Sequence, residues 1–142
     1  MASAHYTVTI KRPSSEVFAF IADGTNAKQW RSGVLDIERL SGDGAGAVYK
    51  QGTKGPGGRR IAADYEVTGY EPGRRLAFRV IAGPVRPTGE YRFAETADGT
   101  TVTFSLDASL TGWKKLLMSR AVQATMESEV HALDTVKRIL EG

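Results

Sequence analysis

The end of the sequence restricts the possible folds more than any other part. Residues 113–141 contain neither proline nor glycine, so they can form an α-helix up to about 43 Å long. With about 100° of rotation per residue, one face of this helix is apolar, and it carries Val122, Met126, Val130, Leu133, Val136 and Leu140. The opposite face carries Arg120, Gln123, Glu127, His131, Asp134 and Arg138. Residues 113–118 do not continue the apolar face, which predicts a bend or a separate turn there.

The segments before this helix predict a sheet for its apolar face to cover. Residues 101–110, "TVTFSLDASL", alternate polar and apolar side chains, and one face carries Val102, Phe104, Leu106, Ala108 and Leu110. The same alternation predicts strands at 60–70, 76–80 and 89–93. One apolar and one polar face are typical of an antiparallel sheet that is covered on one side only.

The first third of the sequence predicts a strand, two short helices and two further strands. Residues 5–10, "HYTVTI", alternate as a half-buried strand does. Pro13 suits the start of a helix, and the apolar residues of "SSEVFAFIAD" follow it at helical spacing. A second helical turn leads through "NAKQW" to Trp30, and strands are expected at 34–40 and 47–51.

Residues 42–60, "GDGAGAVYKQGTKGPGGRR", are rich in glycine and raise the question of a phosphate-binding loop. The dinucleotide pattern G-x-G-x-x-G is incomplete here, and the Walker pattern lacks its Lys-Ser/Thr pair at Gly58-Arg59. Neither pattern leads into a helix, because the sequence downstream is strand-like. We therefore expect two glycine-rich turns around the strand at 47–51 and no phosphate loop.

Composition excludes several classes of site. The 142 residues suffice for a single domain, residues 1–142, with a buried core. Cysteine is absent, which removes disulfides, thiolate nucleophiles and Cys-based zinc sites and fits a reducing compartment. With only two histidines, His5 and His131, a multi-His metal centre is not expected. We predict a cytoplasmic protein without cofactor or metal.

Charge and hydropathy also limit the partners. The sequence has 19 Lys and Arg against 16 Asp and Glu, with no continuous basic face of the kind that nucleic acids require. No segment approaches the about 18 apolar residues of a membrane span, and no secretory signal is visible at the N-terminus. We expect neither nucleic-acid binding nor stable membrane insertion, and either a monomer or a homodimer.

Glu129 is the sharpest candidate for chemistry. On the helical wheel it lies within the apolar stripe, and glutamate is almost never fully buried unless it is paired. A carboxylate that faces the sheet would pair with a cationic or hydroxyl group, or burial would raise its pKa. Either case suits a ligand anchor or a general acid or base. Alternatively, Glu129 forms a structural ion pair or lies in a solvent-exposed position at the mouth of a cavity. His131 lies opposite the stripe and His5 on the polar phase of its strand, so we expect neither to be functional.

Aromatic and amide side chains are candidates for the same interior. Tyr65 and Tyr91 fall on the inward phase of their strands, either as packing residues or as hydrogen-bond donors to a ligand. In "AVYKQ" the phase is open, and we favour Tyr49 and Gln51 inward over Val48 and Lys50. Trp30 is expected to close one end of a pocket or to pack in the core.

The order of these elements carries a resemblance. The initial strand is followed by "PSSEVFAFIAD", Trp30, "GAGAVYKQ", "YEPGRRLAFR", a late "GP" and a helix that ends in "VKRILEG". Nearly the whole chain resembles the START-like (SRPBCC) superfamily, which includes polyketide cyclase/dehydrase proteins and pathogenesis-related allergen-type ligand binders. The resemblance implies an α+β helix-grip fold: a curved antiparallel sheet wrapped around a long C-terminal helix, with two short helices after the first strand.

The resemblance also implies a deep, mostly apolar cavity between sheet and helix. We predict that it binds a small hydrophobic or amphipathic molecule through Trp30, Tyr49, Gln51, Tyr65, Phe78, Tyr91, Phe104, Met126, Val130 and Leu133. If the protein is an enzyme, the resemblance points to metal-independent cyclisation, dehydration or isomerisation of a polyketide-like substrate, with Glu129 as the catalytic acid or base. The alternatives are a non-catalytic carrier or sensor of a lipid, isoprenoid or aromatic metabolite, and a protein-interaction module, because the superfamily includes all of these.

Overall fold

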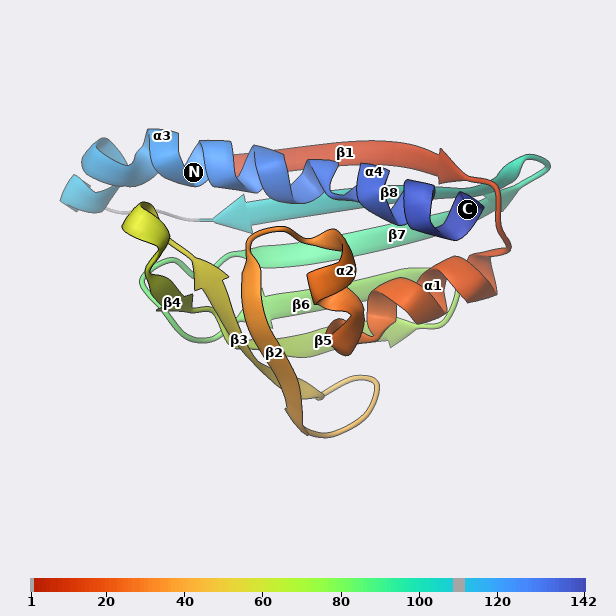
Figure 1. Cartoon of the computed structure of the whole chain (residues 1–142), viewed down its shortest axis with the longest axis horizontal. Coiled ribbons are helices and arrows are strands. Elements are labelled where there is room, and N and C mark those ends of the chain that lie inside the picture. The colour runs from red at the N-terminus through yellow and green to blue at the C-terminus, as the bar shows by residue number, and fades with distance from the viewer. Residues whose placement is uncertain (1, 109–111) are drawn as a thin grey trace.

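The computed structural model describes the backbone of residues 2–108 and 112–142, and the side chains of residues 3–55, 57–108 and 120–142. It is an α+β structure, in which long C-terminal helices lie along one antiparallel sheet (Figure 1). The elements are β1 (Ala2–Ile10), α1 (Ser14–Ala22), η1 (Gly24–Asn26), α2 (Ala27–Trp30), β2 (Val34–Ser41), β3 (Val48–Lys54), η2 (Pro56–Gly58), β4 (Arg60–Ala62), β5 (Tyr65–Glu71), β6 (Arg75–Val80), β7 (Thr88–Thr96), β8 (Gly99–Ala108), α3 (Gly112–His131) and α4 (Leu133–Glu141).

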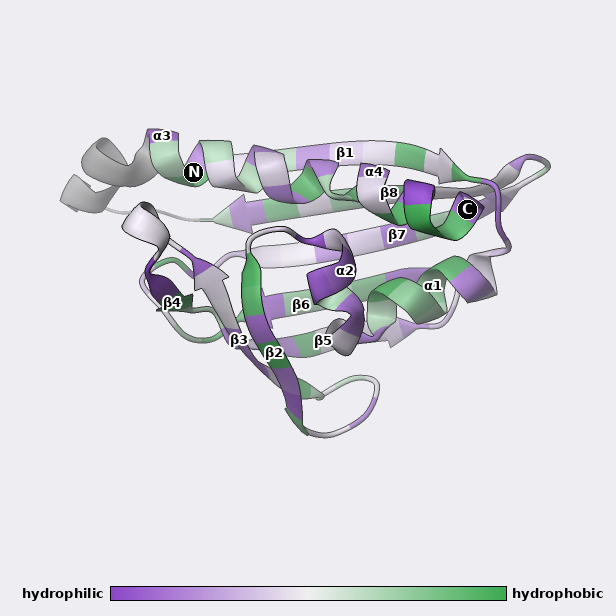
Figure 2. Ribbon diagram, viewed as in Figure 1, coloured by the Kyte–Doolittle hydropathy of each residue, from purple (hydrophilic) through white to green (hydrophobic). Residues whose placement is uncertain are grey.

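The sheet has eight strands in the order β1-β8-β7-β6-β5-β3-β2, with β4 paired to β3. Burial alternates along β8 as predicted, since Val102, Phe104, Leu106 and Ala108 are buried and the residues between them are less so. Leu110, the last residue of the predicted inward set, lies outside the described residues. The sheet therefore presents one apolar face to the helices. In Figure 2, hydrophilic and hydrophobic residues follow one another along the β8 ribbon.

The apolar stripe of the C-terminal helix is buried against the sheet, as predicted. Val130, Leu133 and Val136 have no exposed surface, and α3 packs on β1 and β8 while α4 packs on β1. The predicted bend at 113–118 is wrong: the helix is continuous from Gly112 to His131 and is interrupted at Ala132. There the backbone forms i→i+3 hydrogen bonds, from Ala132 N to Glu129 O and from Thr135 N to Ala132 O. None of the helices in the described part of the chain combines the length and the apolar character that a bilayer crossing requires.

The strand predicted at 60–70 is divided into β4 and β5. Between them, Ala63 N donates to Gln51 O, and the Asp64 carboxylate accepts a hydrogen bond from Gln51 N. β3 pairs with β4 through its last residues and with β5 through its first, so the interruption lies where β3 changes partner. Gln51 is thereby fixed at the change of partner, with its side chain on the inner face.

The glycine-rich stretch forms two turns on either side of β3, as predicted. Gly42, Gly44 and Gly46 have positive φ in the turn before β3, and Gly57 and Gly58 have positive φ after it. Side chains other than glycine rarely adopt this conformation, which explains the composition of the segment without a phosphate loop.

Candidate functional site

A cavity of about 330 Å³ lies between the inner face of the sheet and α3. Much of its wall is apolar, with Leu76, Phe78, Phe104 and Leu106 from the sheet and Val122 and Met126 from the helix. Residues from α1, α2 and the segment 84–87 complete the wall. The helical stripe thus has two uses: part of it packs the core and part of it bounds a hollow.

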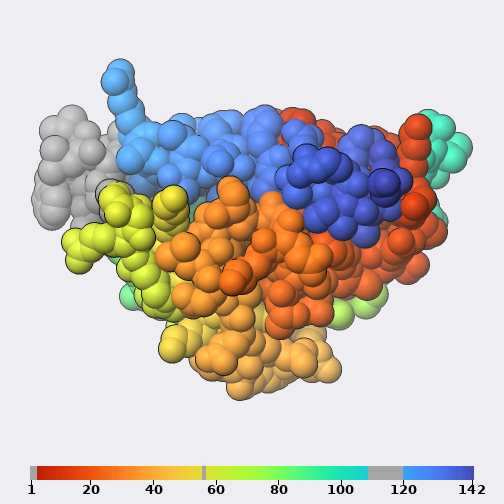
Figure 3. Space-filling model, in the orientation of Figure 1, coloured from red at the N-terminus to blue at the C-terminus, as the bar shows by residue number. Residues whose placement is uncertain are grey.

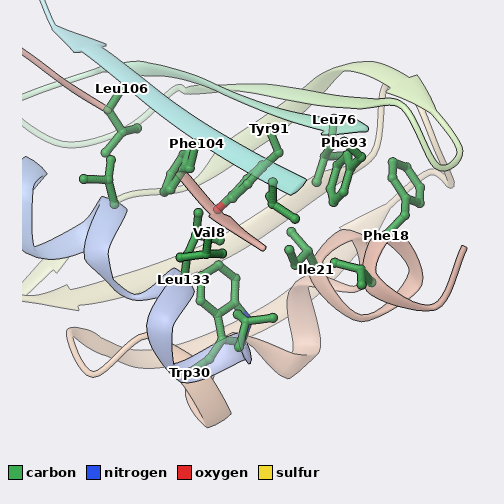
Figure 4. Close-up of a cluster of buried hydrophobic side chains, with 14 of the residues drawn as sticks. Val8, Phe18, Ile21, Trp30, Leu76, Tyr91, Phe93, Phe104, Leu106 and Leu133 are labelled. Atoms are coloured by element: carbon green, nitrogen blue, oxygen red, sulfur yellow. The ribbon is translucent and has the colours of Figure 1, made fainter. Parts of the chain in front are cut away.

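Aromatic rings form the floor of the cavity. Tyr91 and Phe104 are opposite each other on β7 and β8, and their rings stack with centroids 4.0 Å apart. The Phe78 ring lies 6.2 Å from both rings, over Gly89, where any Cβ would collide with it. In Figure 4 the hydroxyl of Tyr91 points away from the sheet, toward the space near Trp30 and Leu133.

A polar network crosses from the helix to β3 at one side of the cavity. Arg31, just after α2, donates from Nε to Glu129 Oε2 on α3 and from Nη1 to Gln51 Oε1 on β3, both at 2.8 Å. Gln51 Nε2 donates in turn to Ala63 O at 3.1 Å. The side chains of Arg31 and Glu129 are only 16% and 20% exposed, so this ion pair is largely withdrawn from water. The ion pair joins the segment that follows α2 to α3, and these two segments lie side by side in Figure 3.

Burial and neighbouring charges shift the pKa values of Arg31, Tyr65 and Tyr91 in the cavity wall. Burial alone would lower the pKa of Arg31, but the Glu129 carboxylate raises it above the ordinary value. Burial raises the pKa of the Tyr65 and Tyr91 hydroxyls, and the Arg31 cation opposes this only in part. Both tyrosines therefore stay protonated at neutral pH and can donate hydrogen bonds.

Most of the predicted site residues meet at this cavity. Its walls include Trp30, Gln51, Tyr65, Phe78, Tyr91, Phe104, Met126 and Glu129. Tyr49 and Gln51 are both on the inner phase of β3, as favoured from the sequence, with exposed fractions of 4% and 3%.

Three predicted ligand contacts belong instead to the packed core. Tyr49 lies behind Tyr65, with ring centroids 5.0 Å apart, and its hydroxyl accepts a hydrogen bond from Gly24 N. Val130 and Leu133 have no exposed surface at all, because they lie where the helices press directly on the sheet. Neither histidine reaches the cavity, and both are exposed.

The sequence analysis missed Arg31. It anticipated that a carboxylate facing the sheet would need a cationic or hydroxyl partner, but nothing in the sequence linked Glu129 to a residue 98 positions earlier. The available signal was the place of Arg31 directly after Trp30, where a charged side chain follows a residue expected at the end of a pocket.

Residues 1–137 match the model of a protein family described as "Polyketide cyclase / dehydrase and lipid transport". The chain belongs to this family. No curated protein sequence matches it. As a member of the polyketide cyclase/dehydrase family, it has the helix-grip fold that the order of its elements implied.

Solved structures confirm this fold for the family member. The protein TTHA0849 from Thermus thermophilus is similar with a TM-score of 0.83 and 20% identity, over 98% of this chain and 97% of that one. The Zhui aromatase/cyclase from Streptomyces sp. R1128 has a TM-score of 0.77 and 20% identity, over 98% and 93%. The di-domain ARO/CYC StfQ from the steffimycin biosynthetic pathway has a TM-score of 0.80 and 13% identity, over 99% of this chain and 51% of its own length.

Proposed function

We propose that the protein binds a small, mainly apolar molecule in the cavity between its sheet and α3. The observation that carries this proposal is a hollow of about 330 Å³ whose walls are apolar on most sides and polar at the Arg31–Glu129 pair. Ligand pockets commonly combine an apolar lining with a few oriented polar groups. A molecule with fused rings or a folded chain and one or two oxygens suits these walls.

The family description supports the same function. It covers both cyclisation or dehydration of polyketides and transport of lipids, and two of the similar structures are aromatase/cyclases. Lipids and isoprenoids have a mainly apolar carbon body, and polyketides combine a carbon chain or ring system with carbonyl and hydroxyl oxygens that can accept hydrogen bonds. We therefore propose a ligand of this kind.

Catalysis is a second candidate, and the surroundings of Glu129 favour it. Glu129, Arg31, Tyr65 and Tyr91 all line the cavity, so a carboxylate and several hydrogen-bond donors could act on one ligand. In its pair with Arg31, Glu129 is a carboxylate, which can remove a proton from carbon or water. The tyrosine hydroxyls could hold a carbonyl oxygen as charge develops on it. Cyclisation or dehydration of a polyketide-like substrate needs these two actions.

A role as a protein-interaction module has less support. Such a role would be favoured by a filled interior and a continuous exposed apolar patch. The large exposed apolar residues of the described chain are instead spread over several elements: Leu35, Leu40, Tyr70, Ile81 and Ile139.

Native mass spectrometry of freshly purified protein tests the binding function. We expect an additional mass under native conditions that disappears on denaturation and belongs to an apolar molecule. A neutral fluorescent probe, 1-aminoanthracene, should bind with an increase in emission and should be displaced by that molecule. Protein without an additional mass that also leaves the probe emission unchanged would contradict the proposal. Conversion of the recovered molecule by the wild type, together with binding but no conversion by Glu129→Gln, would establish the catalytic role.

A further inference from the structure

The charges at the cavity are already balanced. Among the residues whose side chains the structure describes, four charged ones contribute to its walls: Asp23, Arg31, Lys54 and Glu129. Asp23 is exposed and accepts hydrogen bonds from the amide and the hydroxyl of Thr25. Lys54 is exposed at the end of β3. The charges withdrawn from water are therefore those of Arg31 and Glu129, and these two form an ion pair with each other.

We propose that this ion pair selects the charge of the ligand. The cavity takes an uncharged molecule that bears a carbonyl or hydroxyl oxygen, and it rejects a carboxylate of the same shape. The inference rests on the proposed ligand-binding function and adds the chemical class of the ligand to it.

A second carboxylate would find the charge of Arg31 already paired with that of Glu129. Arg31 uses Nε on Glu129 and Nη1 on Gln51, so its cation already has an anion at 2.8 Å. A ligand carboxylate beside Arg31 would also lie beside Glu129, and like charges in a site with little water repel each other strongly. Transfer of an unpaired carboxylate from water into such a site is unfavourable. Lys54 does not change this, because a carboxylate that pairs with an exposed lysine remains in water.

A neutral oxygen meets no such barrier. Tyr65 and Tyr91 both line the cavity, and their hydroxyls stay protonated because burial raises their pKa. A carbonyl oxygen can accept a hydrogen bond from either hydroxyl while the ion pair stays closed. The same wall therefore discriminates between two ligands that differ only in charge.

Glu129→Gln should reverse this preference. Glutamine has nearly the same shape as glutamate but no charge, so Arg31 would keep its place and lose its anion. A ligand carboxylate could then take the part of Glu129 and pair with the guanidinium. The double variant Arg31→Gln/Glu129→Gln removes both charges and should restore the preference for the neutral ligand.

Two naphthalene derivatives of matched shape test the inference: methyl 2-naphthyl ketone and 2-naphthoate. Isothermal titration at pH 7 gives the dissociation constant of each for the wild type, Glu129→Gln and the double variant. Glu127→Gln is the matched control, because Glu127 lies two residues away on the exposed side of α3. Circular dichroism and the melting temperature establish that each variant is folded.

We expect the wild type and Glu127→Gln to bind the ketone at least about tenfold more tightly than the acid. In Glu129→Gln the ratio should shift toward the acid by about tenfold or more, and in the double variant it should return. Equal binding of both compounds by the wild type, or an unchanged ratio in Glu129→Gln, would overturn the inference while leaving the ligand-binding function intact. Binding of neither compound to the wild type would count against the ligand-binding function itself and against this inference with it. If Glu129→Gln does not fold, Arg31→Gln decides: it leaves the Glu129 carboxylate without its cation, so the ratio should shift further toward the ketone than in the wild type. An unchanged ratio in Arg31→Gln would overturn the inference.

Discussion

The ring of Tyr6 on β1 stacks on the imidazole of His131 at the end of α3, with the ring centroids 4.0 Å apart and the planes inclined by 28°. The Tyr6 hydroxyl donates to Asp134 Oδ1 on α4 at 2.8 Å, and this hydrogen bond raises the pKa of Tyr6. His131 Nδ1 lies 2.7 Å from the carbonyl oxygen of Glu127. These contacts fasten both helices to the first strand at the point where the helix is interrupted, and they lie outside the cavity.

We therefore predict that His131→Ala weakens the fold and leaves ligand binding unchanged. Loss of the stacked pair should lower the melting temperature by about 2–4 °C. Affinity for 1-aminoanthracene should stay within about twofold of the wild type. His5→Ala is the control, because His5 is exposed on the same strand and should change neither quantity. A loss of binding in His131→Ala without a loss of stability would show that the histidine belongs to the site.

Leu106→Trp should fill the cavity. Leu106 is buried and lines the cavity, so a larger side chain can extend into the hollow with little strain. We expect at least about tenfold weaker probe binding with a small change in stability. Val102→Phe, on the same face of β8 but away from the cavity, is the control. It should cost about 1–3 kcal/mol of unfolding free energy, measured in urea, because no space receives the ring. A similar loss of unfolding free energy in Leu106→Trp and Val102→Phe would contradict an open cavity beside Leu106.

Gly24→Ala should damage both the fold and the site. A Cβ at Gly24 would lie 2.6 Å from the ring of Tyr49 and would also meet the hydroxyl of Tyr65. Since Tyr49 supports Tyr65 from behind, both rings would have to move. We expect a loss of about 1–3 kcal/mol in unfolding free energy and weaker probe binding. At Gly33 a Cβ would have only an ordinary contact of 3.7 Å with Glu129, so Gly33→Ala should preserve binding. The prediction fails if the two variants bind the probe equally well.

Stability in acid should depend on Glu90, on the outer face of the sheet. Burial raises the pKa of Glu90, but hydrogen bonds from Arg75 and Arg92 lower it more, so that it lies below the ordinary value. A carboxyl with a lower pKa in the folded state stabilises the fold above its unfolded pKa, and this contribution disappears as the pH falls through the folded pKa.

Glu90→Gln should therefore cost about 1 kcal/mol or less at pH 7, since the group is partly exposed. The difference from the wild type should shrink as the pH approaches about 3. Urea unfolding across this range measures it, with Glu38→Gln on β2 as the exposed control. A difference between Glu90→Gln and the wild type that is independent of pH would exclude this role.

The sequence predicted those parts of the fold that depend on side-chain periodicity. The stripe of the last helix and the alternation in β8 follow from the repeat of each element, and burial confirms both. The division of residues 60–70 was missed because it depends on pairing with β3, which lies elsewhere in the chain. The helix break at Ala132 was missed because neither proline nor glycine marks it in the sequence. Asp64 accepts a hydrogen bond from Gln51 N at the interruption, and the sequence around Asp64 does not predict that contact.

The site, like the fold, was predictable where side-chain periodicity decides which face a residue lies on. The inward phase of Tyr65 and Tyr91 places them at the cavity, and the isolated Glu129 in an apolar stripe indicated a paired carboxylate. The identity of its partner was not predictable, because Arg31 reaches it from a turn between α2 and β2. The boundary between cavity and core also escaped the sequence: Met126 and Val130 are equivalent on the helical wheel, yet only Met126 faces the hollow.

The interruption at Ala132 separates a helical segment that borders the cavity, α3, from one that packs in the core, α4. After it, Leu133 and Val136 on α4 are completely enclosed and anchor the chain end to β1; before it, Val122, Met126 and Glu129 on α3 border the cavity. Substitutions on α3 can thus change the shape of the cavity while Leu133 and Val136 keep α4 packed on β1.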